Sequence, residues 1–272
     1  MELPLFDSHA HYFDRRFETD PDSPGAHAIL QEQVFGGGVC GVINVGTNYD
    51  NNLVCIAQAA RYPKMFAAVG LHPEDVFYMT RPMEEELSCL EALLDTEPKR
   101  KQAKIVALGE IGLDYHDHGH PVPKEKQQQY FEAQMELASR LSLPVIIHDR
   151  EAHGDCFETV LRYPSVRGVF HSYSGSAEMA KELIKRGWYL SFSGVVSFRN
   201  AARVAEVAAS VPDEALLIET DCPYLAPHPY RGRMNHSGYL IHTAEALARI
   251  RGCDTETVAA VTRENVRCLF GV

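Results

Sequence analysis

Two histidines separated by one residue give the first sign of metal chemistry in this chain. His9 and His11 flank Ala10 and come directly after a short apolar run. In an extended backbone, residues i and i+2 project from the same face, so both imidazoles can bind one cation. The sequence therefore predicts a metal site at the end of the first strand.

Four further ionisable residues share this placement, because each follows a short apolar run. They are Glu110, His148, His171 and Asp221. Each alone has an ordinary structural explanation, such as a core histidine bonded to backbone or an aspartate that caps a helix. Apolar strands rarely end in ionisable residues with this regularity. The six residues together therefore predict a metal centre.

The donor types indicate which cations suit this centre. Imidazole and carboxylate ligands without cysteine favour Zn, Mn, Co or Ni, or Mg when water completes the shell. Six ligands are too many for one catalytic ion that keeps open positions, but they suffice for two divalent ions. A carboxylate can bridge two ions, so Glu110, midway in strand order, is the predicted bridge. The other ligands then divide between the two ions as His9, His11 and Asp221, and His148 with His171.

Eight short apolar runs predict the strands that position these ligands. The runs are Leu3–Phe6, Gly41–Val45, Met65–Val69, Ile105–Gly109, Pro144–Ile147, Gly168–Phe170, Tyr189–Phe192 and Leu216–Ile218. Helical spacing of apolar residues appears between and after them. It is clearest in Lys124–Leu141, Glu178–Arg186, Gly238–Ile250 and Thr255–Leu269.

Alternation of strand and helix, with strands apolar on consecutive residues, predicts an α/β fold whose parallel strands are covered on both faces. Eight such units form a (β/α)8 TIM barrel, here a single domain over residues 1–272. The six ligands would then converge at the carboxyl ends of the strands. A doubly wound open sheet is the competing fold, but the first predicted strand is not followed by a glycine-rich phosphate turn.

Composition limits the function classes. Among 272 residues, 26 are basic and 37 acidic, a net charge of −11. This charge excludes a protein that coats nucleic acid without sequence preference, but not a local phosphate site built on cations. The seven cysteines include no Cys-x-x-Cys pair, and neither a leader-like N-terminus nor a long apolar stretch is present. We therefore expect a cytoplasmic protein without a membrane segment.

Long ordered motifs resemble the TatD-type metal-dependent hydrolases, a deoxyribonuclease-associated branch of the amidohydrolase-like barrels. The resemblance runs from Phe6 to about Phe270. Its motifs are DSHAH at 7–11, VGLHPE at 69–74, GEIGLDYH at 109–116, the segment ending PVIIHDR at Arg150, FHSYSGS at 170–176, SFSGVVSFRNA at 191–201 and IETDCPYLAPHPYRGRMN at 218–235.

The resemblance implies two divalent ions (Mg, Mn or Zn) on the same six residues. It also implies substrate binding by His72 and Arg231, a 3′-to-5′ exonuclease or related phosphodiesterase activity on DNA, and a cytoplasmic location. The chain departs from the family where members commonly carry Arg-Asn-Glu-Pro, because it has Met234-Asn235-His236-Ser237. This departure weakens the inference about how a substrate end is recognised.

The predicted mechanism is hydrolysis by water activated between two metal ions, with Asp221 as proton acceptor and Glu110 as bridging ligand. Two alternatives stay open. The same ions can hydrolyse an amide, ester or lactone of a small molecule, since a fold does not fix a substrate. A noncatalytic metal-binding protein is the third candidate. No protein partner can be inferred.

Two local features leave their roles open at this stage. The histidines His116, His118 and His120 follow the fourth strand and form either a further metal or phosphate contact or a solvated loop. Tyr224 and Phe198 either stack on a base or serve as packing residues.

Overall fold

The computed structural model describes residues 3–119 and 122–272. Its eight strands follow one another in a single sheet in the order β1 to β8. The strands are β1 Phe6–Ala10, β2 Gly41–Val45, β3 Met65–Val69, β4 Ile105–Asp114, β5 Val145–Arg150, β6 Gly168–Phe170, β7 Tyr189–Phe192 and β8 Leu216–Ile218. The pairs β1–β2, β3–β4, β4–β5, β5–β6 and β7–β8 are parallel.

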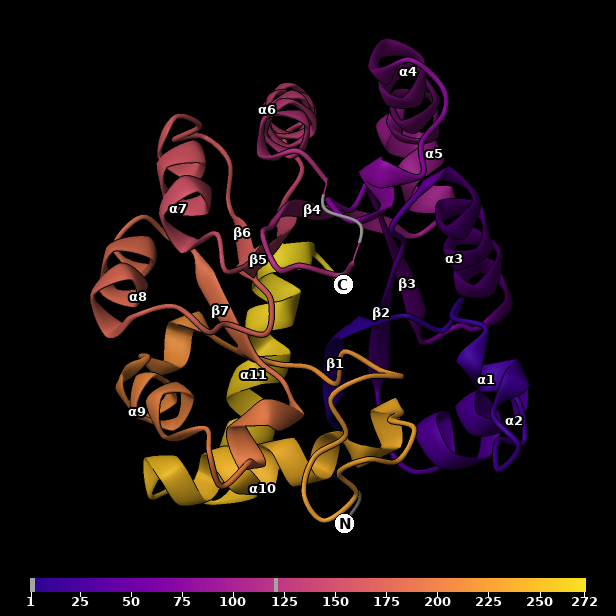
Figure 1. Cartoon of the computed structure of the whole chain (residues 1–272). Helices are drawn as coiled ribbons and strands as arrows, with labels where there is room; N and C mark the ends of the chain where they lie inside the picture. Colours follow the sequence, from indigo (N-terminus) through magenta and orange to yellow (C-terminus); the bar gives the residue numbers. More distant parts are fainter. Residues whose placement is uncertain (1–2, 120–121) are drawn as a thin grey trace. The chain divides into compact units, whose positions relative to one another are not determined.

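Helices separate successive strands and follow the last one (Figure 1). The α-helices are α1 Arg16–Thr19, α2 Ala26–Ala28, α3 Tyr49–Arg61, α4 Met83–Leu94, α5 Glu97–Gln102, α6 Lys124–Leu141, α7 His153–Leu161, α8 Ala177–Ile184, α9 Ala202–Ser210, α10 Leu240–Arg251 and α11 Thr255–Phe270. The short helical elements are η1 Ile29–Phe35, η2 Asp75–Phe77, η3 Gly194–Ser197, η4 Asp213–Ala215 and η5 Ser237–Tyr239.

The predicted helices are confirmed to within two residues at each end, and α6 has the predicted bounds. Polar side chains fix where several of them begin. Asn48, Ser176 and Asp254 each accept a hydrogen bond from a backbone N–H in the first turn of α3, α8 and α11. These caps satisfy donors that the helix itself leaves unpaired. Within the described residues, no helix has both the length and the apolar character needed to cross a membrane.

The chain divides into two compact units, and each is described by itself. One unit contains the residues up to 44 together with 171–272, and the other contains residues 45–170. In the first, α10 packs on α9 and α11, and α8 packs on α9 (Figure 1). In the second, α6 and α7 contact β4, and α3 contacts β3. The single domain over residues 1–272 stays a prediction.

Three strands extend further toward the predicted ligands than the apolar runs indicate. The first begins at Phe6 and reaches Ala10, so His9 lies inside it. The fourth reaches Asp114 and the fifth reaches Arg150. The strand β4 continues to Asp114 and β5 to Arg150 because their backbones pair in parallel register, with Leu113 opposite Asp149 and Asp114 opposite Arg150. The predicted ends of these strands were therefore too early.

Side-chain amides from the helices hold strand ends in the second unit. Asn52 of α3 exchanges two hydrogen bonds with the backbone of Gly70. Gln134 of α6 does the same with Leu71, and Gln127 of α6 with Asp114. These amides are buried, and their bonds satisfy backbone groups that leave the sheet ladder. They fix the backbone next to His72 and at Asp114.

Candidate metal centre

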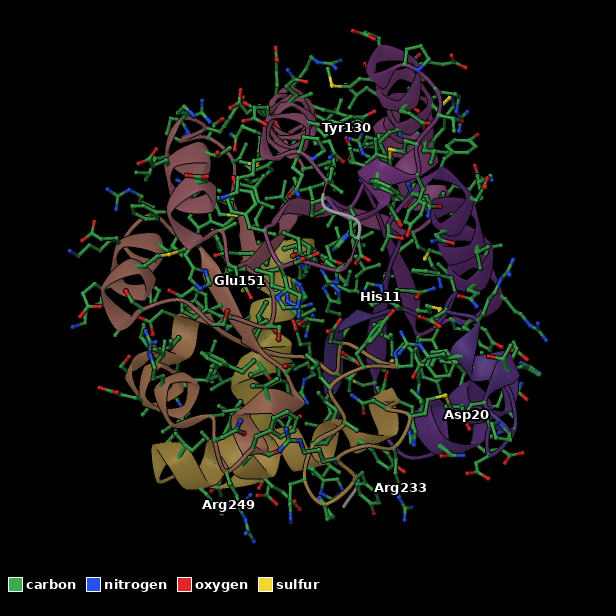
Figure 2. The ribbon with its side chains drawn as sticks, in the orientation of Figure 1. His11, Asp20, Tyr130, Glu151, Arg233 and Arg249 are labelled. Carbon is green, nitrogen blue, oxygen red and sulfur yellow. The ribbon has the colours of Figure 1, made fainter. Side chains whose placement is uncertain are left out.

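In the first unit, His9, His11 and Asp221 bring three possible ligand atoms together, all within 4.8 Å of one another. The Nε2 atoms of His9 and His11 lie 3.0 Å apart. The Asp221 Oδ1 atom lies 3.3 Å from Nε2 of His11 and 3.7 Å from that of His9. Two imidazole nitrogens and a carboxylate oxygen at this spacing suit a first-row divalent cation. In Figure 2, His11 lies among interior side chains, whereas Arg249 of α10 projects outward.

Backbone hydrogen bonds join the end of β1, which carries His9 and leads to His11, to the loop after β8, which carries Asp221. Asp221 N donates to the carbonyl of His9 at 2.9 Å, and His11 N donates to that of Cys222 at 2.8 Å. Burial raises the pKa of Asp221, but the hydrogen bond from His11 and the nearby imidazoles outweigh it and hold the pKa below its usual value. The carboxylate is therefore ionised at neutral pH and ready to bind a cation.

His171 lies beside this group, with its ring stacked on that of His9 at a centroid distance of 4.1 Å. Its Nδ1 lies 3.2 Å from Oε1 of Glu219, which also accepts a hydrogen bond from Ser172 N at 2.7 Å. A carboxylate beside Nδ1 places the proton on that nitrogen and the lone pair on Nε2. Glu219 therefore orients His171 for a cation. This role was not predicted from the sequence, although Glu219 lies two positions before Asp221.

In the second unit, Glu110 and His148 form a second group with His72, and its three donor atoms again lie within 4.8 Å of one another. Glu110 Oε1 lies 2.7 Å from His148 Nδ1 and 3.5 Å from His72 Nε2. The register of the strands explains the first contact. Gly112 lies opposite His148 in the sheet. Glu110 and Asp114 are two residues before and two residues after Gly112, so their side chains lie on the same face of β4 as Gly112. The ring of His148 therefore lies beside both carboxylates.

Asp114 contacts the other side of His148, with Oδ2 at 3.0 Å from Nε2. Burial raises the pKa of Asp114, but hydrogen bonds from His148, His116 N and His118 outweigh it and hold the pKa well below its usual range. A carboxylate that accepts from one ring nitrogen fixes the other as a metal ligand. No role for Asp114 was predicted from the sequence. The signal was its i+4 spacing from Glu110, which puts both carboxylates on one face of a strand.

His72 was predicted to bind substrate, and its hydrogen bonds favour that role over metal binding. The backbone N–H of Glu74 donates to His72 Nδ1 at 3.1 Å. A neutral imidazole that accepts at Nδ1 carries its proton on Nε2, the nitrogen that faces Glu110. His72 therefore presents a hydrogen-bond donor rather than a lone pair.

Arg231 is exposed, and its guanidinium lies 4.4 Å from the ring centroid of Phe198. Tyr224 is covered on one face by Arg16, 3.7 Å from its ring centroid, and donates to Asp14 at 2.9 Å. Both aromatics thus pack against arginine. The structure does not place Arg231 in either metal-binding group.

The segment Met234-Asn235-His236-Ser237 includes a helix cap. His236 Nδ1 accepts a hydrogen bond from Gly238 N and so caps η5. Asn235 donates to the carbonyls of Thr220 and Tyr224, which holds the loop that carries Asp221. Residues 235 and 236 therefore have local structural roles.

The histidines after β4 divide. His116 pairs with the exposed Glu151 at 2.7 Å. His118 lies 3.1 Å from Asp114 and forms a third group of possible ligands with Glu74 and Asp114. His120 lies outside the described residues. The solvated-loop interpretation thus fits His116 but not His118.

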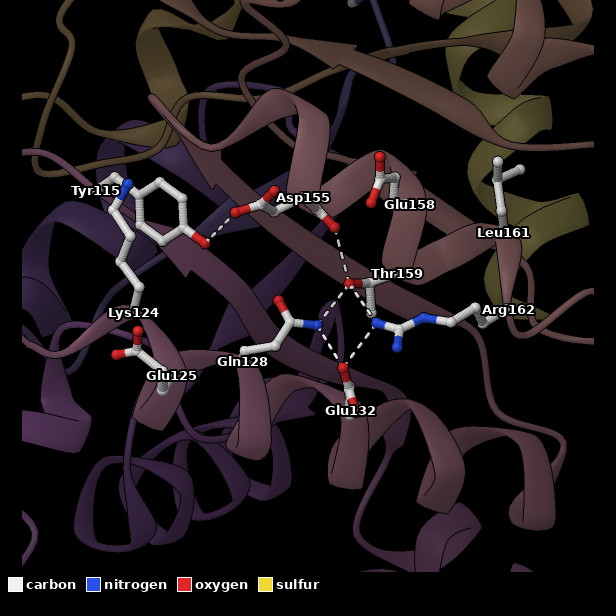
Figure 3. Close-up of a pocket in the computed structure, with 10 residues that line it drawn as sticks. All are labelled: Tyr115, Lys124, Glu125, Gln128, Glu132, Asp155, Glu158, Thr159, Leu161 and Arg162. Carbon is white, nitrogen blue, oxygen red and sulfur yellow. Dashed lines mark hydrogen bonds and ion pairs between the residues drawn. The ribbon is translucent and has the colours of Figure 1, made fainter.

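An open pocket of about 680 Å³ is lined by residues of β4–α6 and α7 in the second unit (Figure 3). Its polar side chains largely pair with one another, as in the hydrogen bonds from Tyr115 to Asp155 and from Arg162 to Glu132. None of the predicted metal ligands lines it. The metal chemistry predicted from the sequence therefore does not belong to this pocket.

Comparison with known proteins gives the same family over nearly the whole chain. The family model described as TatD related DNase matches residues 6–271. A metal-dependent hydrolase of Bacillus subtilis, YabD, named as uncharacterised, is 37% identical over 271 residues, which cover 98% of this chain and 99% of that protein. The 3′-5′ ssDNA/RNA exonuclease TatD of Salmonella typhimurium is 32% identical over 276 residues, which cover 98% and 99%.

Among solved structures, YjjV, a TatD homologue from Escherichia coli, superimposes with a TM-score of 0.87 at 29% identity over the full length of both chains. The predicted (β/α)8 TIM-barrel class is thereby confirmed. The family match and the similarity to YabD show that this chain belongs to the TatD family of metal-dependent hydrolases.

Proposed function

We propose that this hydrolase is a phosphodiesterase that removes nucleotides from the 3′ end of single-stranded DNA or RNA with two divalent ions. The observation that carries the proposal is the pair of histidine and carboxylate groups, His9–His11–Asp221 in one unit and Glu110–His148 in the other. The substrate class is supported by the exonuclease named in Salmonella typhimurium, which is similar over 98% of this chain.

The donor sets fit divalent metal ions, because all are imidazole nitrogens or carboxylate oxygens. His9, His11 and Asp221 would hold an ion in the first unit, where His171 is a further predicted ligand, and Glu110 with His148 would supply ligands in the second unit. Cations bound there supply Lewis acidity toward a phosphoryl oxygen and lower the pKa of water. Mg, Mn and Zn all suit such ligands.

The protein's own residues then have separate tasks. The Asp221 carboxylate, held ionised by its imidazole neighbours, accepts a proton from the attacking water. His72 donates from Nε2 to a phosphate oxygen, since its Nδ1 is occupied by the Glu74 N–H. Arg231 offers a planar guanidinium, which packs on the Phe198 ring, to a second phosphate. In this proposal, the phosphate contacts of His72 and Arg231 determine both the reaction rate and the affinity for substrate.

A second candidate is hydrolysis of an amide, ester or lactone by the same ions. The net charge of −11 favours it, because an acidic surface does not attract a polyanion. The acidic surface does not repel a small neutral substrate.

The test uses the full chain, stripped with chelator and reloaded with Mg, Mn or Zn, on 5′-labelled single-stranded oligonucleotides. We expect stepwise shortening from the 3′ end that requires metal and is lost in Glu110→Gln. Glu132→Gln, in the pocket of Figure 3, is the matched control and keeps activity. Circular dichroism checks that both variants fold.

Two results would contradict the proposal. Full activity in Glu110→Gln would remove Glu110 from the centre and point to a contaminating nuclease. Intact oligonucleotides together with rapid cleavage of an ester or lactone panel would favour the second candidate.

A further inference from the structure

We propose that Glu74, Asp114 and His118 bind an additional divalent cation, separate from the ions of the proposed reaction. One donor atom from each residue lies within 4.8 Å of the other two. Donors to a single first-row cation lie roughly 2.0–2.3 Å from it, and so about 3–4.5 Å from one another. The 3.1 Å between His118 Nε2 and Asp114 Oδ2 has this spacing.

The three residues come from different segments of the second unit. Glu74 follows β3, Asp114 ends β4, and His118 lies in the loop after β4. Two of these segments are fixed by other contacts. Gln127 bonds both backbone groups of Asp114, and Glu74 N is bonded to His72. A cation here would therefore fasten the loop of His118 to a rigid frame.

The charges of these residues favour a bound cation over a simple hydrogen bond between Asp114 and His118. An aspartate–histidine pair needs one carboxylate, but here the oxygens of Glu74 and Asp114 lie within 4.8 Å of each other. Two carboxylates at this distance repel when both are ionised. A divalent cation between them, with a neutral imidazole as third ligand, balances both charges.

The neighbouring histidine provides the contrast. His116, two residues before His118, pairs with the exposed carboxylate of Glu151 and belongs to none of the groups of possible ligands found among residues 3–119 and 122–272. The imidazole of His118 instead lies 3.1 Å from the buried carboxylate of Asp114. The two histidines thus form a matched pair for a test.

The site would also connect to the proposed centre through one side chain. Asp114 Oδ2 is 3.0 Å from Nε2 of His148 as well as 3.1 Å from His118. A carboxylate oxygen has lone pairs for a hydrogen bond and a cation at once. The proposed cation is therefore structural, and it steadies the residue that orients His148.

The experiment counts bound ions in the chelator-stripped full chain, titrated with Zn²⁺ and separately with Mn²⁺, by calorimetry and by metal analysis after dialysis. We expect His118→Ala and Glu74→Gln each to bind one equivalent fewer than the wild type. His116→Ala, the control, binds the wild-type number. Two variants at separate positions guard against a folding defect in one of them.

Equal stoichiometry in the wild type, His118→Ala and Glu74→Gln overturns this proposal and leaves the proposed function intact. Loss of ions in His9→Ala or His148→Ala, without loss in His118→Ala, also overturns it. A wild-type chain that binds no ion overturns both proposals. A deficit of one ion in His118→Ala with nuclease activity absent supports this site and contradicts the proposed function alone.

Discussion

Gly112 of β4 lies directly opposite His148 of β5, and a Cβ atom on Gly112 would overlap the carbonyl oxygen of His148. Gly112 also has a φ of +138°, a conformation that other residues rarely adopt. We expect Gly112→Ala to lower the free energy of unfolding by about 3–5 kcal/mol, from backbone strain and overpacking together. Urea unfolding followed by circular dichroism measures the change.

The control for this change is Gly154→Ala in α7. Apart from the adjacent residues and the backbone of α7 itself, no described atom lies within 4 Å of a Cβ at that position, and its φ is not positive. Alanine favours a helix over glycine by up to about 1 kcal/mol, so this variant should be as stable as the wild type or slightly more stable. Equal stability of Gly112→Ala and Gly154→Ala would show that the strands tolerate a side chain beside His148.

The hydrogen bond from Glu74 N to His72 Nδ1 predicts that substitution of His72 and substitution of His148 affect metal content differently. His72→Ala should keep the wild-type metal content but lower kcat/KM for an oligonucleotide about 10- to 100-fold, the range for loss of a hydrogen bond to a charged group. His148→Ala should lose bound metal. Metal analysis and steady-state kinetics measure the two effects.

Glutamine at position 72 refines this prediction, because its amide can donate as Nε2–H does. His72→Gln should therefore recover part of the activity lost in His72→Ala. A loss of metal in His72→Ala equal to that in His148→Ala would instead make His72 a ligand.

The sequence singled out candidate metal ligands, but it did not single out the further carboxylates that contact their imidazole rings. His9, Glu110 and Asp221 stand out because ionisable residues interrupt or follow apolar runs. Asp114 and Glu219 do not stand out, because an acidic residue near a strand end also fits a turn or a helix cap. Their roles depend on which ring nitrogen they reach, and that is decided by pairing between strands distant in sequence.

The ends of the strands also depend on pairing between strands, which the sequence pattern does not reveal. The predicted apolar runs overlap all eight strands, the first only at Phe6, but β4 continues for five residues past Gly109 because its last four residues pair with β5. Hydrophobicity cannot report hydrogen bonds to a neighbouring strand. The sequence likewise could not predict that His116 and His118 contact different carboxylates, because alternate residues of a loop have no fixed directions.

The contact between Glu219 and His171 predicts a metal-binding defect without loss of a ligand. Glu219→Gln should weaken metal affinity about 10- to 100-fold, as expected when the carboxylate that orients a ligating histidine is removed. Its backbone contact can persist, because a glutamine oxygen still accepts from Ser172 N. Competition with a coloured chelator, well below the unfolding temperature, measures the affinity.

Glu214→Gln is the matched control for Glu219, because it makes the same chemical change at an exposed position five residues earlier. It should bind metal as the wild type does. If both variants retained full affinity, His171 would not depend on Glu219 for its orientation.

His236 predicts how stability changes with pH. Burial lowers its pKa to about 4, whereas an unfolded histidine titrates near 6.5. Between these values the unfolded chain binds a proton that the folded chain does not, so the free energy of unfolding decreases as the pH falls from about 6.5 to about 4. The full contribution of this residue is about 3 kcal/mol, and it is present above pH 6.5.

Asparagine at position 236 removes the titration and keeps an acceptor for Gly238 N, since asparagine is a favourable helix cap. The stability difference between His236→Asn and the wild type should therefore be constant above pH 7 and shift by about 3 kcal/mol in favour of the variant by pH 4. Carboxylates titrate in both proteins, so their effects cancel in this difference. His228→Asn, at an exposed position, should follow the wild type throughout. Parallel curves for the wild type and His236→Asn would mean that His236 becomes protonated in the folded state as easily as in the unfolded chain, contrary to its burial.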